Sequence, residues 1–225
     1  MTNNQCQYLG PNNEHCLHDA VNNDFCYWHD ESQIKNEPDL IKRLETRAQT
    51  GEPMVGFSLR RADLRGINLV NHRHKEGYQL IHSDLYRCNL SESHLFHINL
   101  TGTSLMKANL AQANLNCAVL EKANLLGLHL ENTKMENTLW DDHIIQEIHA
   151  YLSTDENEKL DFFEQSEEIY RNLRRATESQ GLFELTGHFF KREMVMRRYQ
   201  LPKHSTKRCL SKLVDLFCGY GEEPS

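Results

Sequence analysis

The sequence predicts a repeat solenoid at its centre, with a small cysteine-rich segment before it and a helical region after it. Leucine returns at every fifth position from Leu80 to Leu130 without a miss. A small or apolar side chain stands two positions before each of these leucines. Five-residue steps would spread the leucines over every side of a helix or a strand. We therefore expect a coil whose turns stack and bury the leucines along its axis.

The run resembles the pentapeptide-repeat family, whose unit reads A(D/N)LXX. Ala108-Asn109-Leu110, Ala113-Asn114-Leu115 and Ala123-Asn124-Leu125 match that unit letter for letter. The resemblance implies a right-handed quadrilateral β-helix over residues 57–140, with one pentapeptide on each side. It also implies that the leucine and the residue two positions before it point inward. The residues leave open one alternative, a leucine-rich helical segment.

The repeat has one interruption, and a linker lies before the start of the repeat. The first block runs from Phe57 to Leu69, and the next leucine, Leu80, comes one residue later than two whole units would place it. We expect residues 70–77 to leave the wall as a loop, in which His72 and His74 are either solvated or ligands. Residues 36–56 form the linker, with a helix starting at 38–39. The resemblance implies that this helix caps the first coil, whose open edge needs cover.

Residues 1–35 carry a cysteine–histidine cluster with almost no core-forming side chains. Its spacing is C-x9-C-x9-C-x2-H, made by Cys6, Cys16, Cys26 and His29. Three thiolates and an imidazole suit structural Zn²⁺, whose binding would supply the folding energy that so short a segment lacks. The pattern resembles CCCH zinc modules of the WRC type, where the second spacer is one residue longer. A disordered tail, a redox role, or His15 or His18 in place of His29 remain alternatives.

Composition favours a cytoplasmic protein. The chain has 225 residues, a formal net charge of −7 and 7 cysteines. No secretory signal is visible at the polar N-terminus, and no apolar run is long enough to span a membrane. Cysteines in a reducing compartment favour thiols or metal ligation over disulfides.

Helical spacing replaces the five-residue period in residues 141–225. We expect a helix over 144–152 capped by Asp141 or Asp142, a second ending at 180–181, a third over 183–199 and a last amphipathic helix over 205–217. Basic side chains gather near the end and are candidates to face a partner or a membrane: Arg197, Arg198, Lys203, Lys207, Arg208 and Lys212.

Residues 170–198 and 216–222 resemble a subset of the family in which a helical hairpin follows the coil. In that subset a two-helix ion-channel domain comes next, and this sequence stops at Ser225, where its first membrane helix would begin. The resemblance therefore implies either the trimmed soluble part of such a protein or a natural version without a pore. A basic segment at this point is typical of the cytoplasmic side of a membrane, although a solvated face is the simpler interpretation.

No catalytic constellation is visible, since the serines lack a base and no glycine-rich phosphate loop occurs. We expect a non-catalytic cytosolic scaffold or interaction module. Its C-terminal helices would bind a protein partner or a second copy of the chain, which would make it a homo-oligomer. We expect it to lie near a membrane. The alternatives are a DNA mimic that binds type II topoisomerases and a regulatory module with no membrane link. A nucleic-acid partner is not expected, because the cysteine-rich segment is acidic.

Overall fold

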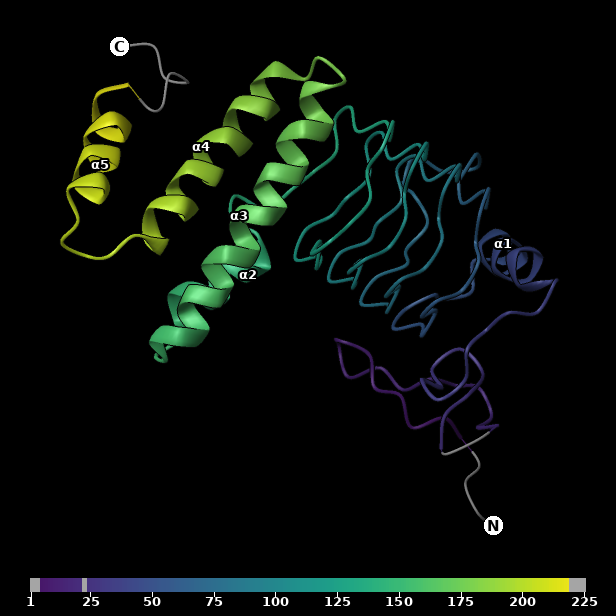
Figure 1. Cartoon of the computed structure of the whole chain (residues 1–225). Helices are drawn as coiled ribbons and strands as arrows, with labels where there is room; N and C mark the ends of the chain where they lie inside the picture. Colours follow the sequence, from purple (N-terminus) through teal and green to yellow (C-terminus); the bar gives the residue numbers. More distant parts are fainter. Residues whose placement is uncertain (1–4, 22–23, 219–225) are drawn as a thin grey trace.

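The structure is a computed structural model that describes residues 5–21 and 24–218. Figure 1 shows a stack of coils in the middle of the molecule. The N-terminal segment and α1 (Leu40–Thr50) lie at the end where the stack begins. At the other end lie α2 (Ile145–Leu152), α3 (Glu156–Glu178), α4 (Phe183–Gln200) and α5 (Thr206–Cys218). Residues 219–222, part of the resemblance described above, lie outside the described residues.

The coil has four sides. Parallel bridges join Asp84 to Ser104 and Asn89 to Asn109, so one turn takes twenty residues, which is four pentapeptides. Within the described residues the pairing takes the form of isolated bridges, because each side is only one pentapeptide long. The first turn is longer, since Ser58 pairs with Asp84, 26 residues on. This first turn contains residues 70–77, for which a loop was predicted.

The interior of the coil is the predicted apolar ladder. Leu85, Leu105 and Leu115 are fully buried, and so are Ala108 and Ala113 from the position two residues before a leucine. Both inward positions are thereby confirmed. Burial of this set supplies the stability of the stack, at about 25 cal/mol for each Å² of apolar surface removed from water.

Each corner of the coil is a tight turn. The residue two positions after a leucine has a positive φ, for example 58° at Lys107 and 61° at Gln112. The N–H of Ala108 donates to the carbonyl of Leu105 over 3.0 Å and closes the turn, as in a type II turn. A non-glycine residue with this φ costs about 1–2 kcal/mol. The cost is offset because the turn keeps every leucine pointing inward.

The helix α1 lies at the edge of the first coil. Its Leu40, Leu44 and Ala48 are buried. The carboxylate of Glu45 accepts a hydrogen bond of 2.8 Å from the backbone N–H of Asn68 in that coil. A backbone donor on an open edge is thus satisfied by a side chain.

At the opposite end, α3 covers the last coil. The side-chain amide of Asn172 donates to the carbonyl of Leu128 over 2.6 Å, and Gln180 accepts from the N–H of Met135 over 3.0 Å. The helical region is therefore bonded directly to the end of the stack.

The predicted helix boundaries hold to within one or two residues, but the predicted cap at Asp141 or Asp142 is wrong. The helix α2 begins after Ile144, which makes no capping hydrogen bond through its side chain. The carboxylate of Asp141 instead accepts from the backbone N–H of Lys122. Asp141 therefore satisfies a backbone group of the coil rather than one of the helix.

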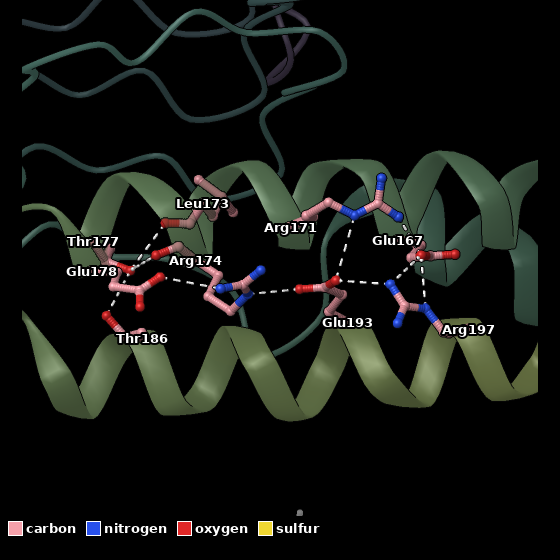
Figure 2. A network of polar contacts seen from close by, with 9 residues as sticks. All are labelled: Glu167, Arg171, Leu173, Arg174, Thr177, Glu178, Thr186, Glu193 and Arg197. Carbon is pink, nitrogen blue, oxygen red and sulfur yellow. Dashed lines mark hydrogen bonds and ion pairs between the residues drawn. The ribbon is translucent and has the colours of Figure 1, made fainter. Parts of the chain in front are cut away.

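Ion pairs between α3 and α4 join the helical hairpin (Figure 2). The carboxylate of Glu193 on α4 lies 2.8 Å from Arg174 and 3.4 Å from Arg171, both on α3. Glu167 on α3 reaches Arg197 on α4 over 3.0 Å. Each carboxylate is largely buried and has more than one arginine partner, which gives a fixed geometry that isolated surface pairs lack.

Candidate metal centre

Two short backbone features bring the predicted ligands together. A hairpin with its turn at Gly10-Pro11 pairs the N–H of Cys6 with the carbonyl of His18, and that of Cys16 with the carbonyl of Tyr8. The strands of this hairpin thus place Cys6 and Cys16 side by side. A tight turn is closed by the N–H of His29, which donates to the carbonyl of Cys26. This turn brings the side chains of Cys26 and His29 toward each other.

The four ligand atoms form one cluster. They all lie within 4.8 Å of one another, and no other such group of histidine, cysteine or acidic side chains occurs in the described part of the chain. The sulfurs of Cys16 and Cys26 are 3.8 Å apart. Nδ1 of His29 is 3.4 Å from the sulfur of Cys6 and 3.3 Å from that of Cys26.

These distances fit a tetrahedral ion. Zinc bonds of ~2.3 Å to sulfur and ~2.0 Å to nitrogen place two sulfurs roughly 3.8 Å apart and a sulfur and a nitrogen roughly 3.5 Å apart. The Cys3His cluster therefore has a donor set and spacing that can bind a metal. Four protein donors would be enough to fill the positions of a tetrahedral ion.

The second ring nitrogen of His29 is already engaged. Its Nε2 lies 2.9 Å from the carbonyl oxygen of Val55, so Nε2–H donates and the lone pair of Nδ1 is left for the cluster. Metal-bound histidines usually make such an outer hydrogen bond, which fixes both tautomer and ring orientation. The ring of Tyr8 stacks on His29 at 3.8 Å between centroids and restrains it further.

The electrostatics of the cluster favour a cation. Burial and the neighbouring cysteines raise the pKa of Cys16 to about 12, although a hydrogen bond from the backbone of His18 acts to lower it. Burial likewise raises the pKa of Cys26. Burial also lowers the pKa of His29, which keeps the imidazole neutral and able to donate its lone pair. Cys16 and Cys26 would therefore act as thiolate ligands only with a bound cation to stabilise the negative charge.

The cluster is attached to the start of the coil. Trp28 stacks on Phe57, the first inward residue of the coil, at 4.8 Å between ring centroids. The backbone N–H of Ser58 donates to the carbonyl of Trp28 over 2.8 Å. Arg47 of α1 lies over the ring of Phe57 at 5.3 Å. The N-terminal segment and α1 therefore cover the open end of the coil together.

Two contributors at this site were not predicted. Tyr8 and the carbonyl of Val55 hold His29, and a backbone carbonyl carries no signal in sequence. The alternative ligands are placed elsewhere, since His15 is exposed and Nε2 of His18 accepts from Arg47 over 2.6 Å. The loop histidines, His72 and His74, are exposed and belong to no metal-ligand cluster in the described residues.

The predicted basic set at the C-terminus divides into paired and unpaired residues. Arg197 contacts Glu167 and Glu193, and Arg198 lies 2.6 Å from Asp215. Further members also have partners, since Lys203 lies 3.3 Å from Glu156 and Arg208 donates to the carbonyl of Leu201. Lys207 and Lys212 on α5 are exposed.

A four-sided coil with a leucine ladder and both ends covered defines a β-solenoid protein. The repeat also matches a known family. Residues 83–116 and 103–139 match the family model described as Pentapeptide repeats, with 8 copies. Residues 83–139 therefore form a pentapeptide-repeat region of this chain. The twenty-residue turn agrees with the quadrilateral β-helix that the resemblance implied. The comparison with curated proteins found no match to this chain.

Several solved pentapeptide repeat proteins are similar to this chain. Rfr23 from the cyanobacterium Cyanothece 51142 is 33% identical over 38% of this chain and 60% of its own, with a TM-score of 0.32. HetL from Nostoc sp. strain PCC 7120, involved in heterocyst differentiation regulation, is 28% identical over 36% of this chain and 38% of its own, with a TM-score of 0.19. QnrB1, a plasmid-mediated fluoroquinolone resistance protein, is 16% identical over 36% of this chain and 61% of its own, with a TM-score of 0.20. This chain thus spans less than two thirds of the length of each of these proteins.

Across the described ranges, none of the helices combines the length and the apolar character that crossing a bilayer would require.

Proposed function

We propose that this protein is a non-catalytic scaffold. The observation that carries the proposal is that both ends of the coil are bonded to distinct modules. Trp28 and α1 cover the first coil, whereas Asn172 of α3 and Gln180, just beyond the end of α3, bond the last one. A stack held in this way is a spacer of fixed length, with a helical hairpin presented at one end for a partner.

The Cys3His cluster is a structural Zn²⁺ site in this proposal. Cys6, Cys16, Cys26 and His29 are its ligands, and the ion would hold the N-terminal segment in the shape that meets Phe57. A segment this small buries too little surface to keep that shape alone. The zinc ion has no catalytic role here, because its four positions are all filled by protein.

The C-terminal helices are the proposed contact region. They would bind another protein or a second copy of the chain at the cytoplasmic face of a membrane, as expected for the soluble regulatory part of the channel-like subset. Lys207 and Lys212 support a location near anionic lipid, since both are exposed cations on the last described helix.

Light scattering of the full chain over a wide concentration range tests this proposal. Self-association predicts a mass that rises to a defined multiple of the chain mass. A strict monomer at high concentration would count against the homo-oligomer and leave a different protein as the partner.

The DNA-mimic alternative is disfavoured by the charge on one corner of the coil. Arg61, Arg87 and Lys107 are exposed and follow one another on successive turns, because the N–H of Arg61 bonds the carbonyl of Tyr86 and that of Arg87 bonds Met106. A duplex mimic needs acidic flanks, whereas this corner is basic. Inhibition in a topoisomerase supercoiling assay would restore the alternative.

A further inference from the structure

The last described helix, α5, is oriented with its polar side toward the protein. Asp215 lies 2.6 Å from Arg198 of α4, and Arg208 donates to the carbonyl of Leu201 over 2.9 Å. The guanidinium of Arg208 also lies over the ring of Tyr199, 5.4 Å from its centroid. These contacts direct the opposite side of α5 away from α4.

That opposite side is apolar, and its side chains are exposed in the described part of the chain. Leu210 is 63% exposed, Leu216 is 76% exposed and Phe217 is 73% exposed. Leu213 and Val214 are exposed as well. At 100° per residue, the apolar side chains of α5 span roughly 160° of its circumference. In Figure 1 α5 lies on the far side of α4 from the coil, so this face is at the outside of the molecule.

Two lysines border the apolar face. By the same helical geometry Lys207 falls at one edge of the arc and Lys212 at the other. Both are exposed. Lysine chains at such borders extend their charge toward headgroups while their methylene stems lie against acyl chains.

We propose that α5 docks in the plane of an anionic lipid surface, with its apolar arc in the headgroup and acyl boundary. Charge complementarity selects this occupant, because Lys207 and Lys212 would both meet lipid phosphates. A second copy of α5 laid antiparallel would instead bring lysine against lysine. The inference deepens the membrane location in the proposed function and rests on that location.

Vesicle flotation of the full chain tests the proposal, with phosphatidylcholine vesicles that either contain or lack phosphatidylserine. We expect the protein to float with the anionic vesicles and to be released by salt. Lys207→Gln with Lys212→Gln should weaken binding by roughly 30-fold. Leu216→Glu with Phe217→Glu should abolish it.

The matched control is Phe183→Glu on α4, since Phe183 is 77% exposed but lies outside α5. This variant should bind like the unmodified protein. Failure of the unmodified protein to float, or flotation unaffected by the α5 substitutions, overturns the proposal. Loss of self-association instead of flotation in Leu216→Glu with Phe217→Glu would assign the face to a second copy, which also overturns it. The light-scattering result without vesicles judges the self-association in the proposed function separately.

Discussion

Nε2 of His29 and the carbonyl oxygen of Val55 are 2.9 Å apart, and this hydrogen bond joins the Cys3His cluster to the chain that enters the coil. His29 thereby has one nitrogen directed at the three cysteines and the other at the backbone just before the first inward residue, Phe57. The geometry of the cluster and the cover over the end of the coil depend on each other through this ring.

Gly56 offers a test of how tightly the N-terminal segment sits on the coil. It has a φ of 69°, and an added Cβ would lie 1.8 Å from the hydroxyl oxygen of Tyr8. Gly56→Ala should therefore displace Tyr8 from His29 and lower the melting temperature of the protein. Gly51→Ala is the matched control, since Gly51 has a φ of 77° but nothing within 4 Å of the added Cβ.

The control should cost only the backbone strain, about 1 kcal/mol. In a Tyr8→Ala background, Gly56→Ala should cost no more than Gly51→Ala does, because the clash is gone. Equal losses for both glycines in the unmodified protein would contradict the packing described for Tyr8.

The leucine ladder predicts a steep contrast between inward and outward apolar residues. Leu105 is fully buried, whereas Phe96 is 37% exposed. Leu105→Ala should reduce the free energy of unfolding by about 2–5 kcal/mol, because it leaves a cavity between packed coils. Phe96→Ala should cost less than about 1 kcal/mol. Denaturant unfolding of both variants measures this, and similar losses would rule out the inward ladder.

Glu167 should make the helical hairpin sensitive to acid. Burial acts to raise the pKa of its carboxyl, but hydrogen bonds from Gln200, Arg197 and Arg171 outweigh it and lower the pKa. Because folding lowers this pKa, the ionised carboxylate stabilises the folded protein at pH values above the unfolded pKa of ~4.3. That stabilisation is lost as the pH falls through the pKa of the folded protein.

Glu167→Gln should lower the melting temperature at pH 7. It should also make the melting temperature fall less between neutral pH and pH values below ~4 than it does in the unmodified protein. The exposed neighbour Glu168 supplies the control, because Glu168→Gln should follow the unmodified protein at both pH values. A Glu167→Gln profile parallel to that of the unmodified protein would show that this carboxyl does not carry the acid sensitivity.

The repeat was the most predictable part of the molecule. Leu80 to Leu130 repeat at a period that no helix or strand can bury, so the pattern alone implied a stacked coil with buried leucines. The second inward position, two residues before each leucine, came from the family resemblance. The cysteine–histidine cluster was also visible in the sequence. Cys26 and His29 are a local pair, and three cysteines stand in a short polar segment that has few core-forming side chains.

The contacts between modules were not predictable. The bond from His29 to Val55 involves a backbone atom, and the stacking of Trp28 on Phe57 depends on where the coil begins. Asp141 has the sequence context of a helix cap, yet a tertiary contact with the N–H of Lys122 takes its carboxylate. Such choices depend on which backbone groups the fold leaves unpaired, and local sequence does not encode that.

The metal content of the purified full chain is the most direct test of the account. Elemental analysis should find one zinc ion per chain, and Cys26→Ser should lose both the zinc and the protease resistance of residues 5–35. Cys209→Ser should keep both, because Cys209 is an exposed thiol on α5. A chain without metal whose N-terminal segment still resists proteolysis would contradict the proposed zinc centre.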